Sequence, residues 1–455
     1  MRDENKRFST EPQEVIPQAI RPAETITQFD LAVVINAVCQ QTIEPTREGR
    51  VPKRIFNKIR PLLKGKVRLD YDALDLYLEI LLSILQVQTI IQLAPPLLPD
   101  GKDAYEPGSE LAWWQEQDVV QQTCYLLTLW IAHGGWRELA GVNFVPWDLY
   151  SWKPILGRDR LVERLKGYTP GRWYPISFLL DDLWRNDPFA MRPHFTMTRA
   201  QKKTGALREK WLGCDGETYI GMLSVSLYEM GIVSLGYEQA DALSDTQPRN
   251  PDYFLVTELG ETVFSLIDKP PATYVPPENS ARSLIVQPNF ELLLLEPDFH
   301  TLYKVLPFSL VQQVGVASRL TLTHASVLRA VERGMKLDTI LAVLEECSQK
   351  ELPQNVVYTL KDWVKDYKEI TISQVYLLEV DSEEVADHLS TSPKLQKTLR
   401  GFHLRKIAPC ILIIDSSINL LELKRLLEKE GVAVRISGDF SERLKSAPYT
   451  YGIMR

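Results

Sequence analysis

A short segment rich in proline divides the chain and limits how it can fold. Residues 268–281 read DKPPATYVPPENSA and hold four prolines. Proline lacks a backbone N–H and has a fixed φ, so neither a helix nor a central strand continues through such a segment. The 455 residues are enough for about two to four domains. We therefore expect a linker at 268–281, with separately packed regions on either side.

Before this linker, the residue pattern gives the same order of elements twice. Apolar residues recur at helical spacing in three segments up to residue 85, and two apolar strand-like stretches follow. Three helices and a hairpin are the order of a winged-helix fold. A second cycle starts near Trp173. We predict a disordered tail over 1–24, a winged-helix-like domain with a helical extension over 25–150, and a second winged-helix-like domain over 165–267.

After the linker, the pattern changes to short strands and amphipathic helices. SLIVQPNFELLLLE, residues 283–296, predicts a hairpin that turns at Pro288 and Asn289. In ELPQNVVYTLKDWV, Pro353 favours a helix start, and Trp363 is expected to be largely buried. A strand is also expected from Val432. We predict an α+β domain over 282–455, and for the whole chain a multidomain α+β fold of two winged-helix-like units followed by this domain.

The sequence lacks the usual catalytic and metal-binding patterns. It has no G-x-x-x-x-G-K phosphate loop, G-x-S-x-G or H-E-x-x-H segment, and its six histidines do not stand at ligand spacing. The five cysteines are scattered, which favours a reducing compartment. We expect no enzyme activity, no catalytic residues, no metal, no cofactor and no membrane association, and a cytoplasmic protein.

Positive charge gathers in three stretches of a chain whose net charge is −7. Such local excess can neutralise nucleic-acid phosphates, although it can also be an ordinary solvated surface. The candidate phosphate-binding residues are Arg47, Arg50, Lys53, Arg54, Lys58, Arg60, Lys64 and Lys66 in the first stretch, Arg199, Lys202, Lys203 and Arg208 in the second, and Lys397, Arg400 and Arg405 in the third. Because Arg50, Arg54 and Lys58 are four residues apart, we predict that they share one helix face.

The region from residue 283 to about 437 resembles the N-terminal, helicase-associated domain of XPB/Ssl2-type DNA helicases. The similar features are LIVQPNFELLLLE, the LTLTHASVLRAVERGMKLDTILAVLEEC segment, LPQNVVYTLKDWV and the later PCILIID and LLEKEGVAV. The resemblance implies an α+β domain that helps a helicase to engage DNA. It also extends to bacterial stand-alone proteins that carry this domain behind winged helices, without a helicase motor.

Two classes of function follow from these patterns. The first is a non-enzymatic DNA-binding adaptor that holds duplex or single-stranded DNA and docks a separate helicase, nuclease or other protein subunit. The alternative is a protein-interaction scaffold in a multi-protein assembly without direct DNA contact, because winged helices serve both roles. An enzyme of unfamiliar type is a third hypothesis.

Overall fold

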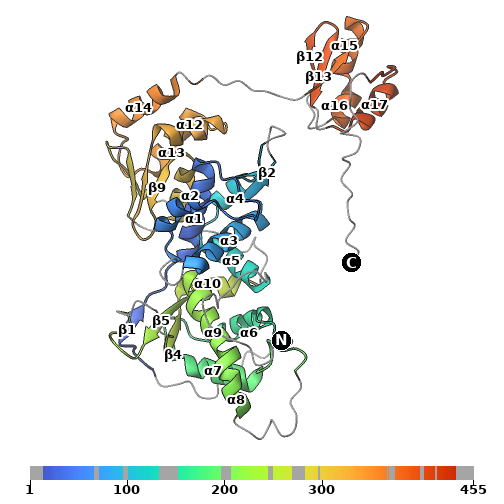
Figure 1. Cartoon of the computed structure of the whole chain (residues 1–455). Helices are drawn as coiled ribbons and strands as arrows, with labels where there is room; N and C mark the ends of the chain where they lie inside the picture. Colours follow the sequence, from blue (N-terminus) through green and yellow to red (C-terminus); the bar gives the residue numbers. More distant parts are fainter. Residues whose placement is uncertain are drawn as a thin grey trace. The chain divides into compact units, whose positions relative to one another are not determined.

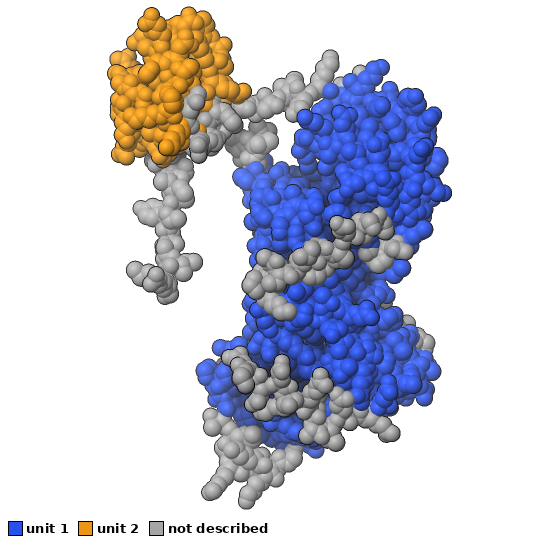
Figure 2. Space-filling model, turned by 180° about the vertical axis from the view of Figure 1, so that it is seen from behind, with its two compact units in different colours: residues 1–367 blue, residues 368–455 orange. Residues whose placement is uncertain are grey.

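The computed structural model describes residues 14–65, 71–95, 101–132, 152–195, 206–243, 250–268, 282–295, 298–365, 367, 375–399, 404–415 and 418–436. Residues 1–13 of the disordered tail predicted over 1–24, and all but residue 268 of the predicted linker, lie outside these residues. The prediction of disorder is wrong at 19–21, where the chain forms a strand that pairs with a later one. The chain forms two compact units, residues 1–367 and 368–455 (Figure 2). Helices and antiparallel sheets alternate in both (Figure 1), which confirms a multidomain α+β fold. Among the described residues, no helix is long and apolar enough to cross a lipid bilayer.

The first cycle of elements follows the predicted order. Its elements are α1 (Ile26–Gln40), α2 (Lys53–Ile59), the 3₁₀ turn η1 (Arg60–Leu62), α3 (Tyr71–Val87), and the hairpin β2 (Ile91–Ala94) and β3 (Ala104–Pro107). Pro52 starts α2: its φ is −56° and its carbonyl accepts hydrogen bonds from the N–H groups of Ile55 and Phe56. Two further helices, α4 (Leu111–Gln115) and α5 (Val119–Ala132), extend this region.

The second cycle has the same order of elements. They are α6 (Ile155–Leu165), β4 (Trp173–Pro175), α7 (Ile176–Asn186), a long helix, the hairpin β5 (Val233–Tyr237) and β6 (Tyr253–Val256), and α10 (Glu258–Leu266). The long helix comprises α8 (Ala206–Trp211), η4 (Leu212–Gly216), α9 (Glu217–Gly221) and η5 (Met222–Leu227), of which η4 and η5 are π-helical. Gly231, at φ +82°, makes the turn from this helix into β5.

Strand pairing also agrees between the two cycles. In each, the extended segment between the first and second helices pairs with the last strand of the hairpin. Ile43 forms an antiparallel bridge with Tyr105 in β3, and β4 pairs with β6 through Trp173 and Leu255. The N-terminal strand β1 (Ala19–Arg21) joins the second sheet, whose order is β1-β5-β6-β4. The order of elements thus repeats, but the second cycle begins with α6, before the start near Trp173 that the sequence predicted.

Residues 282–365 form a third region of the first unit. Its sheet has the order β7-β8-β10-β9 and is accompanied by helices. The bounds are β7 (Leu284–Val286), β8 (Glu291–Leu294), α11 (Phe299–Val305), η7 (Leu306–Phe308), β9 (Leu310–Gln313), β10 (Ser318–Thr321), α12 (His324–Glu332), α13 (Leu337–Cys347) and α14 (Gln354–Lys365). The predicted hairpin and the helix start after Pro353 are both present. Trp363 is only partly buried, which corrects the expectation of a largely buried side chain.

Helix α1 holds this third region against the first cycle. Fourteen of its fifteen residues are buried. The Asn36 side chain donates to the carbonyls of Leu306 and Ser309, at 2.9 and 2.7 Å, and accepts from the N–H of Val311 at 3.0 Å. One apolar core runs through the whole unit, from Ala19 to Leu360. The boundary between the compact units thus falls after residue 367, within the range 282–455 that we expected to be one domain.

The second unit is a small sheet with helices. Its elements are β11 (Val375–Glu379), α15 (Glu383–Thr391), α16 (Pro393–Thr398), β12 (Arg405–Ala408), β13 (Ile411–Asp415) and α17 (Leu420–Lys429), with the strand order β11-β13-β12. The strand predicted from Val432 is wrong over residues 432–436, because no ladder forms there. Val432 and Val434 nevertheless alternate inward onto the core of this unit, which explains the strand-like pattern.

Candidate nucleic-acid interface

The first basic stretch forms a turn and a short helix on the surface of the first unit. Arg47 lies in the turn before α2, and Lys53, Arg54 and Lys58 are exposed on the helix. On the opposite side, Phe56 and Ile59 are buried in the core. Apolar contacts therefore fix the helix, and its cationic side chains point to solvent.

Four of these cations differ from Arg50 and Lys64 in their pairing. Arg47, Lys53, Arg54 and Lys58 form no ion pair with any other residue that the structure describes. Arg54 and Lys58 are one helical turn apart, about 6 Å along the axis. We call these four residues the α2 cationic surface. Exposed guanidinium and ammonium groups at this spacing suit contacts with successive phosphates.

Arg50 has a different position from the one predicted. It precedes the start of α2 at Lys53, so it shares no helix face with Arg54 and Lys58, and this prediction is wrong. Its Nε lies 3.8 Å from a carboxylate oxygen of Glu48 and 3.8 Å from one of Glu79. The physical reason is Pro52, whose missing N–H and fixed φ set the helix start.

The end of the first basic stretch packs against other parts of the protein. The Nζ of Lys64 is 2.8 Å from Glu24 and 5.2 Å from the ring centre of Phe29, so its charge is already paired. Arg60 is exposed at the start of η1. Lys66 lies outside the described residues. Among the described cations of the first stretch, Arg50 and Lys64 are thus paired with carboxylates, whereas Arg47, Lys53, Arg54 and Lys58 are not.

A buried carboxylate, which the sequence analysis missed, anchors the end of the first basic stretch. Asp30 of α1 accepts hydrogen bonds from the N–H groups of Lys64 and Gly65, at 2.7 and 2.9 Å, and from the hydroxyl of Tyr77 in α3 at 2.7 Å. Burial raises the pKa of Asp30 to about 6, and these hydrogen bonds lower it in part. The only signal in the sequence is one acidic residue inside the apolar run of α1.

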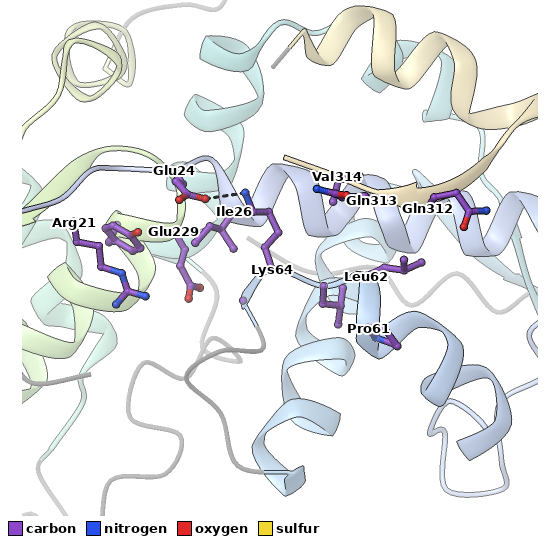
Figure 3. Close-up of a pocket in the computed structure, with 13 residues that line it drawn as sticks. Arg21, Glu24, Ile26, Pro61, Leu62, Lys64, Glu229, Gln312, Gln313 and Val314 are labelled. Atoms are coloured by element: carbon purple, nitrogen blue, oxygen red, sulfur yellow. Dashed lines mark ion pairs between the residues drawn. The ribbon is translucent and has the colours of Figure 1, made fainter. Parts of the chain in front are cut away.

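A pocket of about 570 Å³ lies beside Lys64 (Figure 3). It is lined by segments that are far apart in the sequence, among them Arg21, Tyr228 and Gln313. The cations in its wall are occupied: Lys64 pairs with Glu24, and the guanidinium of Arg21 lies 5.1 Å from the ring centre of Tyr228. This pocket marks where the regions of the first unit meet, and its charges are largely balanced.

The other two basic stretches contribute little to this surface. Arg208 of α8 forms an ion pair with Asp181. Lys397 and Arg405 are exposed, but they belong to the second compact unit. The remaining candidates are outside the described residues: Arg199, Lys202, Lys203 and Arg400. Within the described chain, the α2 cationic surface is therefore the group of candidate residues that the fold brings together.

The helices that precede the two hairpins are poor candidates for groove contact. Helix α3 contains Asp72, Asp75 and Glu79 and no lysine or arginine. The long helix from α8 to η5 is mostly buried from residue 211 onward. In its π-helical segment η4, Asp215 forms an ion pair with Arg192 at 2.7 Å, and both side chains are fully buried. These two helices therefore do not present a cationic face comparable to that of the turn and α2.

The described residues contain no group of three or more His, Cys, Asp or Glu side chains that could hold a metal ion. Comparison with known proteins gives one family. Residues 284–404 match the family described as the helicase conserved C-terminal domain, and this match runs from β7 in the first unit to the residue before β12 in the second. No curated protein matches the chain. A little over a quarter of this chain is thus a helicase-associated domain.

Proposed function

We propose that this protein is a non-enzymatic, helicase-related adaptor that binds DNA. The α2 cationic surface contacts the phosphates, and the region that begins at residue 282, which resembles the XPB/Ssl2-type domain, engages a separate helicase or nuclease. One observation carries the proposal: in a chain of net charge −7, four exposed cations that have no ion pair among the described residues gather on one helix and its turn.

The organisation of the two cycles supports this reading. A helix, an extended segment, two helices and a hairpin, with the extended segment paired to the last strand, is the order of a winged-helix domain. The helix before each hairpin is acidic or buried, so the contact differs from groove insertion. Helix α2 contacts the sugar-phosphate backbone of the DNA, so the affinity should depend only weakly on base sequence.

A scaffold without DNA contact is the second candidate. Burial of the long helix in the second cycle favours it, because a winged helix used for packing has no need of an accessible helix before its hairpin. On this reading, the cations of α2 would be an ordinary solvated surface.

A salt titration distinguishes the two candidates. Binding of a fluorescent duplex to the full chain is followed by anisotropy over a range of salt concentrations. Three to four phosphate contacts predict that log K falls with log salt at a slope of about −3 to −4. A chain that binds no duplex or single strand, even at low salt, supports the scaffold and overturns the adaptor that binds DNA.

A further inference from the structure

The sheet of the second unit has two unlike faces. Tyr376, Leu378, Leu412 and Ile414 pack with α15 and α17 in the core of this unit. Side chains alternate along a strand, so the residues next to these point to the opposite face of the sheet. We call that face the outer sheet face, and its residues are Val375, Leu377 and Glu379 of β11, Ile411 and Ile413 of β13, and Arg405, Ile407 and Ala408 of β12. None of them belongs to the apolar core that the described part of this unit forms.

The outer sheet face is far more apolar than a solvated sheet face. An antiparallel sheet that meets water on one side normally carries polar residues there. Here only Glu379 and Arg405 are polar, and Leu377 and Ile407 are 55% and 58% exposed. An exposed apolar patch of this kind marks a contact with another molecule. Because its one cation is balanced by a carboxylate, the patch offers no path for successive phosphates, and the partner that it fits is a protein.

The positions of the two charges indicate which protein fits. Strand β13 is the middle strand, so Glu379 and Arg405 stand on opposite edge strands. Arg405 pairs in register with Ile413, and Glu379 pairs with Ile411, two residues away along the same strand. Two residues of a strand span about 7 Å. Neither charge forms an ion pair with another described residue.

We propose that the outer sheet face binds the same face of a second copy of this chain and forms a symmetric dimer. A two-fold axis parallel to the strands places β13 on β13, and β11 of each copy over β12 of the other, with the sheets about 10 Å apart. Ile411 and Ile413 then meet their own counterparts. Arg405 of each copy lies about two residues along from Glu379 of the other copy, within reach of its long side chain, so two ion pairs form.

This arrangement favours a second copy over other proteins. A different partner has to supply an acid and a base at these two places, whereas a second copy already carries both. A two-fold axis perpendicular to the strands would place β11 on β11 and leave Glu379 and Arg405 two strand spacings apart, about 10 Å across the sheet. The charges therefore favour the axis parallel to the strands. The proposal goes beyond the proposed function and does not depend on DNA binding.

The first test is the oligomeric state of the full chain without nucleic acid. The face is small, so we expect association in the micromolar range, and light scattering over about 1–100 µM should show the mass rising from one chain to two. Leu377→Glu places a charge without a partner in the interface and should weaken association at least ~10-fold. Leu421→Glu is the matched control, because Leu421 lies on α17 of the same unit and is 50% exposed. It should associate like the parent.

The second test reverses the charges and applies even if Leu377→Glu does not fold. Glu379→Arg alone, or Arg405→Glu alone, brings like charges together twice in each dimer and should weaken association by about 10-fold. When the two variants are mixed, a dimer with one copy of each regains both ion pairs. The mixture should therefore associate about as tightly as the parent.

Three results would overturn the proposal. If the parent stays monomeric over the whole range, the outer sheet face binds a different protein. If Leu377→Glu associates as tightly as the parent, the dimer forms through another surface. If the mixture of Glu379→Arg and Arg405→Glu associates no more tightly than either variant alone, the two charges do not meet across the proposed two-fold axis.

Discussion

The side chain of Asn355 donates a hydrogen bond to the carbonyl oxygen of Pro288 at 2.8 Å. This bond joins the start of α14 to the turn of the β7–β8 hairpin. Eight residues further along α14, Trp363 stacks on Phe290, with ring centres 5.4 Å apart. The two most distinctive segments of the helicase-associated domain are thus in contact. Their pattern of Pro-Asn-Phe and Leu-Pro-x-Asn with a later Trp is explained by packing.

Removal of the indole should destabilise this contact measurably. Trp363 is partly buried, so Trp363→Ala should lower the free energy of unfolding by about 2 kcal/mol, less than the 3–5 of a fully buried aromatic. Tyr358→Ala on the same helix, at a side chain that is 70% exposed, is the control. Chemical denaturation of both variants measures the difference. Equal midpoints for the two would contradict the packing role of Trp363.

Asn36 should be essential for attaching the third region to α1. It is 3% exposed, and its amide makes three hydrogen bonds to backbone groups near residues 306–311. Asn36→Leu removes the partners of these buried groups, at about 1–3 kcal/mol for each group left unsatisfied. We expect a loss of at least ~3 kcal/mol and faster hydrogen exchange at the Val311 amide. Unchanged exchange at that amide would show that the attachment does not depend on Asn36.

The carboxyl of Asp30 should make stability depend on pH in a defined direction. Its pKa in the folded chain is about 6, above the value of 3.8 for the unfolded chain. The folded state therefore binds this proton more tightly, and the contribution of Asp30 to stability falls as the pH rises from about 4 to 6, by up to about 3 kcal/mol. The measurement is the unfolding free energy of the parent minus that of Asp30→Asn across this range. A difference in unfolding free energy that stays constant or grows with pH would contradict a raised pKa of Asp30.

Breaking the buried ion pair of the second cycle should destabilise the fold far more than breaking an exposed ion pair. Arg192 and Asp215 are 0% and 1% exposed, so Asp215→Asn leaves a buried guanidinium without its counter-charge. We expect a loss of about 3–5 kcal/mol. Arg208→Gln breaks the exposed pair with Asp181 and should cost less than about 1 kcal/mol. Thermal unfolding of the two variants measures both losses. Equal decreases in melting temperature would show that burial of the ion pair does not determine its contribution to stability.

Local patterns predicted the elements well, because the features that start and end them lie within a few residues. Thr323 illustrates this: it caps α12 and forms a capping box with Ser326. The same reasoning failed for Arg50, since helical spacing was extended across Pro52 into the turn. The contacts of Asn36 and Asp30 were not predictable, because their partners lie far away in the sequence and nothing local identifies them.

The candidate site was predicted only in part for the same reason. Composition identified the basic stretch, but it could not separate exposed cations from paired ones. Lys64 pairs with Glu24, forty residues earlier, and Arg208 pairs with Asp181 from another helix. Which charges remain open depends on tertiary structure.

Removal of the positive charges of α2 should weaken the binding of DNA. Lys53, Arg54 and Lys58 are changed together to Gln, and Lys350, Lys361 and Lys365, which are exposed elsewhere in the same unit, are changed to Gln as a control of equal charge. Since Phe56 and Ile59 still hold the helix, thermal stability should not change. We expect binding at least ~10-fold weaker, and a salt slope reduced in magnitude by up to about 3, for the α2 variant only. An α2 variant that binds DNA as tightly as the parent, or no more weakly than the control, would contradict it.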